Sequence, residues 1–139
     1  MSALLLDTHI LLWLDSGNPS LRTQTREWIE AHWRSGAGLV VSAVSAWEIA
    51  LLAESGRITL DIPPDEWLQR FLSRPGIMAA PLGVPAATRA YALDDFEHRD
   101  PADRLLIATA IVEGWTLVTY DARILAYSTS HGRRIGLNA

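Results

Sequence analysis

Short aliphatic runs alternate along the chain with longer segments in which apolar residues recur at helical spacing. The runs are continuous and bounded by polar or turn residues, which predicts buried strands at 3–6, 38–41, 77–80 and 116–119. Helical patterns occupy 10–14, 20–34, 46–55, 63–71, 85–93 and 102–113, and a last helix begins at Asp121. Strands and helices therefore alternate along most of the chain.

Residues that commonly start or stop helices support these boundaries. Ser42 or Ser45 can cap the helix of 46–55, and Gly114 suits the end of the helix that precedes the last strand. Strands that alternate with helices form parallel sheets covered by helices on both faces. We therefore expect the α/β class, as a single domain over 1–139 with a mostly parallel sheet in an α/β/α sandwich.

Composition excludes several kinds of protein. The chain has no cysteine, which rules out a disulfide framework, a thiolate zinc site and a cysteine nucleophile. The apolar residues near the start are interrupted by Asp7 and His9 and follow no basic leader, which is not the pattern of a signal peptide or a membrane span. We expect a cytoplasmic protein without a membrane partner.

Charge gives a weaker indication about partners. The formal net charge of -4 argues against a nucleic-acid partner, because phosphate binding usually draws on excess basic residues. All 12 basic residues are arginine, however, and the planar guanidinium group suits phosphate oxygens. Some of the acids can also be committed to a metal ion, so that local charge matters more than net charge.

Five acidic residues fall where a parallel sheet binds its ligands, at the carboxyl ends of the strands. Asp7 and Asp121 come just after predicted strands. Glu48 lies early in the helix after the second strand, and Asp100 and Asp103 flank the start of the helix before the last strand. A simpler interpretation is that each acid caps a helix and interacts favourably with the positive end of the helix dipole. Such an interaction stabilises the fold by about 0.3–1 kcal/mol for each acid.

The spacing of these acids favours a metal site over capping alone. Glu48 has apolar neighbours in sequence, where an unpaired carboxylate is costly, and Asp100 and Asp103 are three apart, where like charges repel unless a cation lies between them. Carboxylates without thiolates suit Mg²⁺ or Mn²⁺ better than zinc. Two such ions would support in-line hydrolysis of a phosphodiester. His9 and His98 lie nearby in sequence, but a lone histidine is more often structural, and we leave both out of the catalytic set.

Four segments in order resemble the successive motifs of PIN domains, and in particular of VapC toxins: Leu4-Leu5-Leu6-Asp7-Thr8-His9, Ser42-Ala43-Val44-Ser45-Ala46-Trp47-Glu48-Ile49, His98-Arg99-Asp100-Pro101-Ala102-Asp103-Arg104-Leu105-Leu106-Ile107-Ala108 and Leu117-Val118-Thr119-Tyr120-Asp121. The resemblance implies an Mg²⁺- or Mn²⁺-dependent ribonuclease that acts on RNA. It also implies inhibition by a VapB-type antitoxin, and we expect a homodimer.

By this resemblance, the catalytic set is Asp7, Glu48, Asp103 and Asp121, and the metal ligands are the same four with Asp100. Many relatives place their third acid three residues before the Ile-Ala pair, where this chain has Arg104. Asp103 is then the nearest replacement and Asp100 a second candidate. Thr119 and Ser45 match hydroxyls that often line the pocket and would hold a metal-bound water, or simply end a strand and start a helix.

Two other classes share parts of this pattern. Haloacid-dehalogenase-like phosphatases and response-regulator receivers also place an aspartate after the first strand. Both use a lysine, which this chain lacks, and the phosphatases use a second aspartate at the position where this chain has His9. A catalytically silent PIN-like module would bind RNA or protein through its six tryptophans. Most of these tryptophans have the spacing of core residues, although three suit a dimer interface, namely Trp13, Trp28 and Trp33.

Overall fold

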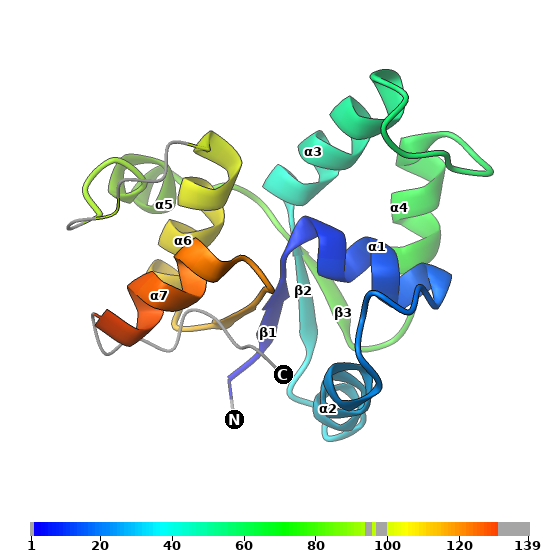
Figure 1. Cartoon of the computed structure of the whole chain (residues 1–139), viewed down its shortest axis with the longest axis horizontal. Coiled ribbons are helices and arrows are strands. Elements are labelled where there is room, and N and C mark those ends of the chain that lie inside the picture. The colour runs from blue at the N-terminus through cyan, green and yellow to red at the C-terminus, as the bar shows by residue number, and fades with distance from the viewer. Residues whose placement is uncertain (1, 94–95, 97–99, 131–139) are drawn as a thin grey trace.

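The computed structural model describes residues 2–93, 96 and 100–130 and confirms the predicted alternation of strands and helices (Figure 1). The elements are β1 (Leu4–Leu6), α1 (Thr8–Ser16), α2 (Thr23–Arg34), β2 (Leu39–Ser42), α3 (Ala43–Glu54), α4 (Pro64–Leu72), β3 (Ile77–Ala80), α5 (Val84–Arg89), α6 (Pro101–Glu113), β4 (Thr116–Val118) and α7 (Ala122–Ser130). No helix in this described part combines the length and the hydrophobicity that crossing a bilayer requires.

The four strands form one parallel sheet in the order β3-β2-β1-β4. Leu4 is the register partner of Leu39 on one side and of Thr116 on the other, so β1 lies in the interior of the sheet. Its three residues are fully buried. The continuous aliphatic run predicted a strand covered on both faces, and the structure confirms it.

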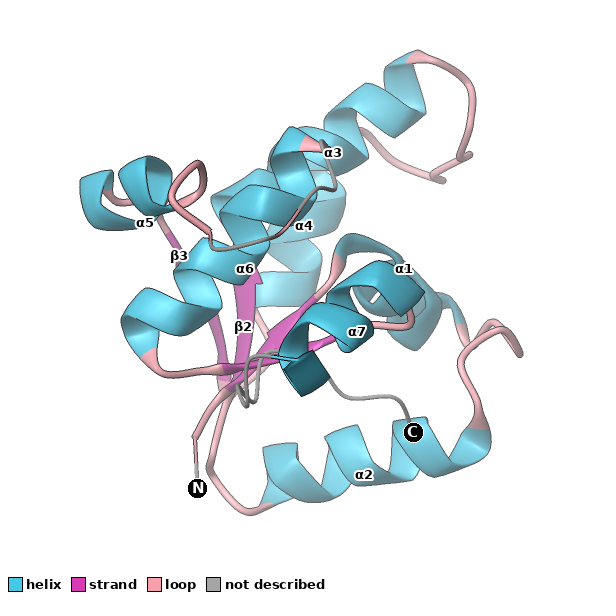
Figure 2. Cartoon of the chain, turned by 60° about the vertical axis from the view of Figure 1, so that its left-hand side comes forward, coloured by secondary structure: helices cyan, strands magenta, loops and turns pink. Residues whose placement is uncertain are grey.

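Alternate residues of the strands separate two hydrophobic cores. Leu4 and Leu6 face a core built with α1, α2, α3 and α4, whereas Leu5 faces a second core built with α6 and α7. Figure 1 shows these two groups of helices on opposite sides of the sheet, and Figure 2 shows α2 lying below α1 and α7. The α/β/α arrangement therefore follows from the period of two along each strand.

Helix α3 begins earlier than its pattern predicted. The Ser42 side chain accepts a hydrogen bond from the Val44 N–H at 3.0 Å and caps the helix, which starts at Ala43. Ser45, the other candidate cap, is instead a buried residue of the first turn. Glu48 consequently lies more than one turn inside α3.

Two helices are shorter than their patterns predicted, and a polar group binds the backbone beside the shortened end of each. Helix α2 starts three residues later, after a turn in which the Asn18 side chain accepts from the Ser20 N–H. Helix α5 ends at Arg89, and the carbonyl of the next residue, Ala90, accepts a hydrogen bond from the Arg104 guanidinium at 2.8 Å.

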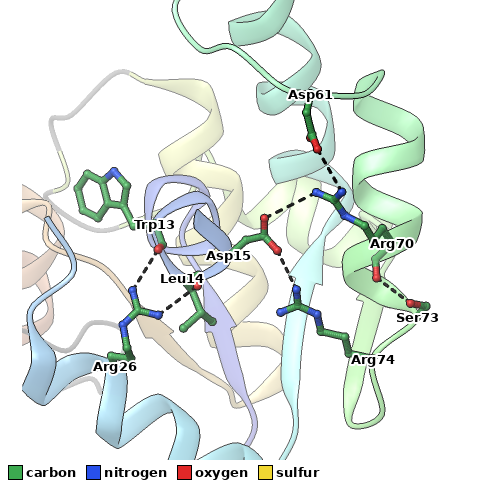
Figure 3. A network of polar contacts seen from close by, with 8 residues as sticks. All are labelled: Trp13, Leu14, Asp15, Arg26, Asp61, Arg70, Ser73 and Arg74. Carbon is green, nitrogen blue, oxygen red and sulfur yellow. Dashed lines mark hydrogen bonds and ion pairs between the residues drawn. The ribbon is translucent and has the colours of Figure 1, made fainter. Parts of the chain in front are cut away.

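An ion-pair network fixes the end of α1 to α4 (Figure 3). Asp15 lies in the last turn of α1, where a negative charge is unfavourable to the helix dipole. Its carboxylate accepts from Arg74 at 2.9 Å and lies 4.0 Å from Arg70, which also pairs with Asp61 at 3.4 Å. The Asp15 side chain is 14% exposed and that of Asp61 is 69% exposed, so the two carboxylates differ strongly in solvent screening.

Replacing Asp15 should destabilise the fold more than replacing Asp61. We expect Asp15→Asn to lower the free energy of unfolding by about 1 kcal/mol, since both arginines are partly exposed and the pairs are screened. Asp61→Asn is the matched control and should cost less than about 0.5 kcal/mol. Urea denaturation of both variants measures the difference, and equal losses would show that the buried position of Asp15 contributes nothing.

Candidate active site

The candidate site lies at the carboxyl ends of β2, β1 and β4. Asp7 follows the last residue of β1 directly, and its N–H donates to the Val118 carbonyl at the end of β4. Asp121 comes three residues after β4, and Glu48 projects from α3, the helix that follows β2. The chain passes from β1 to β2 and β3 on one side of β1 and then crosses from β3 to β4 on the other side, and open parallel sheets form their binding crevices at such a change of side.

One pocket of about 460 Å³ brings all the predicted acids together. This volume is within the range of small-molecule sites, roughly 300–1,000 Å³. The acids that line it are Asp7, Glu48, Asp100, Asp103 and Asp121, and the remaining wall consists of His9, Ile10, Trp13, Tyr120 and Arg123. The pocket therefore combines carboxylates with three ring-bearing side chains, those of His9, Trp13 and Tyr120.

Buried hydroxyl groups hold two of the carboxylates in place. Thr119 donates to Oδ2 of Asp7 at 2.6 Å, and Thr8 donates to Oε1 of Glu48 at 2.5 Å. The Thr8 hydroxyl also lies 3.0 Å from the Ser45 hydroxyl. All three hydroxyl residues are buried. The sequence indicated Thr119 and Ser45 as hydroxyls of the pocket. It did not indicate Thr8, because the role of Thr8 depends on a contact with α3 that the sequence does not show.

Three of the acids also cap helices, as the simpler interpretation predicted. The Asp7 carboxylate accepts from the Thr8 N–H at 2.7 Å and begins α1. Asp100 accepts from the N–H of Ala102 at 2.9 Å and begins α6. Asp121 accepts from the N–H of Arg123 at 2.8 Å at the start of α7, and its carboxylate lies 3.8 Å from the Arg123 side chain. Capping leaves further lone pairs on each carboxylate, so the two roles are compatible.

Burial and the charges of neighbouring acids raise the pKa of two carboxyl groups of the pocket, those of Asp7 and Glu48. Burial raises the pKa of Asp7, although hydrogen bonds from Thr119 and Thr8 oppose the shift. Burial also raises the pKa of Glu48 above its ordinary value, and the charges of Asp7, Asp100 and Asp103 add to this effect. A cation in the pocket would relieve both the desolvation and the repulsion.

The oxygen donors of the pocket fit a hard divalent cation. Among residues 2–93, 96 and 100–130, no group of three or more Asp, Glu or His side chains is arranged to hold a metal ion as it stands. Mg²⁺, however, commonly binds through one or two carboxylates and keeps several of its waters, so it does not need a closed cage of side chains. The donor chemistry and the repulsion between the acids therefore suit Mg²⁺ or Mn²⁺.

Arg104 holds the backbone beside the pocket, and the acid next to it in the sequence, Asp103, lines the pocket. Its guanidinium donates to the carbonyls of Ala90 and Phe96, and so fixes the chain that leads into α6. Asp103, one residue earlier on the helix, lines the pocket. His9 lines the pocket as well, although it was left out of the predicted set, and His98 lies outside the described residues.

Comparison with known proteins identifies the fold family. The family model of the PIN domain matches residues 4–129. The chain belongs to the PIN-domain family. Similar proteins include Ribonuclease VapC22 of Mycobacterium tuberculosis, which is 37% identical over 127 residues, 91% of this chain and 93% of the relative. Membership of the PIN-domain family excludes the two alternatives of a haloacid-dehalogenase-like phosphatase and a response-regulator receiver.

Solved structures share the fold of this PIN domain. A toxin–antitoxin complex from Klebsiella pneumoniae matches with a TM-score of 0.65 and 22% identity, over 96% of this chain and 95% of that one. VapBC2 from Rickettsia felis, bound to a DNA fragment from its promoter, matches with a TM-score of 0.67 and 16% identity, over 90% and 92%. FitAcB from Neisseria gonorrhoeae matches with a TM-score of 0.56 and 21% identity, over 97% and 96%.

The raised pKa of Asp7 predicts how stability responds to pH in the metal-free PIN domain. Burial raises the pKa of Asp7 in the folded protein above its ordinary value of 3.8. The folded state therefore gains its full relative stability from this group below pH 3.8, where the carboxyl is neutral, and loses that stability as the pH rises through the raised pKa. At about pH 7 the charged group therefore opposes folding. Asp7→Asn keeps a capping side chain and should raise the melting temperature there by a few degrees.

Thermal denaturation in the presence of a chelator tests this expectation at neutral pH and again below pH 3.8. The gain from Asp7→Asn should disappear at the lower pH, where both forms of the protein carry a neutral group. Asp61→Asn, on an exposed carboxylate far from the pocket residues, provides the control and should show no such dependence. A gain of equal size at both pH values would exclude charge as its cause.

Proposed function

We propose that this chain is a divalent-metal-dependent endoribonuclease that hydrolyses RNA phosphodiester bonds as the toxin of a type II toxin–antitoxin system. The observation that carries the proposal is the convergence of five carboxylates in one pocket at the carboxyl edge of the sheet. The name of the relative from M. tuberculosis, Ribonuclease VapC22, supports the reaction, and the toxin–antitoxin complexes of the same fold support the biological setting. The substrate would then be cytoplasmic RNA.

In this proposal Asp7, Glu48, Asp103 and Asp121 hold Mg²⁺ or Mn²⁺. When bound, the ion supplies an activated water and neutralises charge on the phosphate. Thr119 and Thr8 keep the two most constrained carboxylates oriented toward the pocket.

Asp103 is the better candidate for the third ligand, and Asp100 for the cap. The Asp100 carboxylate is exposed and accepts from two N–H groups of α6, at 2.9 and 3.4 Å. Asp103 is half-buried one turn further along the pocket wall. A metal-binding role for Asp100 remains compatible with this geometry as an outer contact through water.

The proposed partner is a VapB-type antitoxin that places a basic side chain among the carboxylates. A concentration of negative charge in a pocket favours a cationic group from the inhibitor. We also propose a homodimer, although Trp13, Trp28 and Trp33 pack against the first core rather than forming an open surface. Trp47 on α3 is 60% exposed, so it is an exception to the core spacing expected for most of the tryptophans.

Removing the charge of Asp7 should abolish cleavage without unfolding the protein. We expect Asp7→Asn to lower kcat/KM by more than about 100-fold, because even changes next to a ligand often cost about 10–100-fold. Gel assays on a mixed pool of structured RNAs would compare the variant with wild type in Mg²⁺, in Mn²⁺ and with chelator. Asp61→Asn is the control for a neutralised aspartate outside the pocket. Wild-type cleavage that survives chelation would overturn the metal-dependent mechanism.

The variants Asp103→Asn and Asp100→Asn should show which of the two aspartates is a metal ligand and which is only the cap of α6. We expect Asp103→Asn to lose about 10-fold or more in affinity for Mn²⁺, and Asp100→Asn to lose less, since asparagine is as good an N-cap as aspartate. The rise in melting temperature on titration with Mn²⁺ measures this independently of activity. The opposite order of affinities would assign the ligand role to Asp100.

A further inference from the structure

Three aromatic rings form a row along the wall of the acidic pocket. The ring centroids of His9 and Trp13 are 5.7 Å apart with planes tilted by 52°, and those of Trp13 and Tyr120 are 6.0 Å apart with a tilt of 40°. All three residues line the pocket together with the carboxylates. We call this set the aromatic wall.

The surrounding structure holds the aromatic wall in place. The Tyr120 hydroxyl lies 2.6 Å from the Thr25 hydroxyl and accepts from the Arg22 N–H at 3.1 Å. Arg26 donates to the Trp13 carbonyl at 3.2 Å and so secures the last turn of α1. Figure 3 shows the Trp13 indole pointing away from Asp15 and its ion pairs. These rings are ordered before any ligand binds, which lowers the entropic cost of binding.

We propose that Trp13, supported by Tyr120, stacks against an unpaired base of the RNA next to the phosphate that is cleaved. This inference rests on the proposed ribonuclease function and adds to it the form of the substrate. Single-stranded RNA presents phosphates and unstacked bases side by side, and aromatic side chains bind such bases by stacking. A pocket lined both by carboxylates that can hold a metal-bound phosphate and by aromatic rings that can stack on a base matches this alternation.

The same geometry implies selectivity for flexible RNA. A base inside a duplex is already stacked between its neighbours and would have to be extruded before it reached Trp13. Single-stranded loops therefore bind without that cost. Sequence preference at this position should be mild, because every base has a face that can stack.

The test uses a short unstructured RNA in which wild-type enzyme cleaves one mapped position in Mn²⁺. A set of otherwise identical RNAs carries an abasic nucleotide at successive positions around that site. We expect one abasic position to lower kcat/KM of the wild type by about 5- to 150-fold, the range of stacking on one aromatic residue. Trp13→Ala should lose a similar factor on the intact RNA and become insensitive to the abasic substitution at that position.

Three variants control for folding, for tryptophan content and for the contacts of the tyrosine hydroxyl. Trp13→Phe retains a ring and should keep most of the sensitivity to the missing base. Trp47→Ala removes an exposed tryptophan that does not line the pocket and should behave as wild type. Tyr120→Phe keeps the stacking face but removes the hydroxyl contacts, and should retain the abasic effect.

The outcomes distinguish stacking from the underlying function. Wild-type cleavage that is equally fast on intact and abasic RNAs at every position would overturn the stacking proposal and leave ribonuclease activity intact. Normal RNA cleavage by Trp13→Ala, together with weaker binding of the antitoxin, would assign the aromatic wall to a protein partner instead. Absence of RNA cleavage by the wild type in both Mg²⁺ and Mn²⁺ would overturn the proposed function and this inference together.

Discussion

The negative charge of Asp7, held at the end of a fully buried strand, is the constraint around which the site is organised. Its carboxylate is desolvated, and a second acid, Asp121, is close enough to raise its pKa further. Hydrogen bonds from Thr119 and from the first N–H of α1 partly offset this cost. The fold therefore accepts an unfavourable charge at the sheet edge, and such local costs in an otherwise consistent structure are typical of functional sites.

Most of the fold could be predicted because it depends on local patterns. The continuous aliphatic run of β1 indicated a strand covered on both faces, and the alternation of such strands with helical patterns indicated a parallel sheet with helices on either side. The boundaries were less certain where polar side chains compete for the backbone. Ser42 caps α3 three residues earlier than the apolar pattern indicated, and the Asn18 side chain accepts from the Ser20 N–H where α2 was expected to begin.

The acids of the site were predictable from their position after strands, but their surroundings were not. Glu48 depends on a hydroxyl of Thr8, forty residues earlier in the chain, and no spacing rule links them. The aromatic wall has the same origin, since the sequence indicated Trp13 only as a residue for a dimer interface, and Trp13 meets Tyr120 only when β1 and β4 pair. Contacts between distant segments thus supply the orientation of residues whose types sequence had already indicated.

Three helices, α1, α6 and α7, begin at aspartates of this one pocket, so their amino-terminal ends converge on the same acidic region. Each helix start carries a partial positive charge of about half a unit, which balances part of the repulsion between the carboxylates. The backbone therefore supplies part of the positive potential that the gathered carboxylates require. Because this potential comes from three separate helix starts, unwinding the first turn of any one of them would weaken it for the whole pocket and not only for the aspartate that caps that helix.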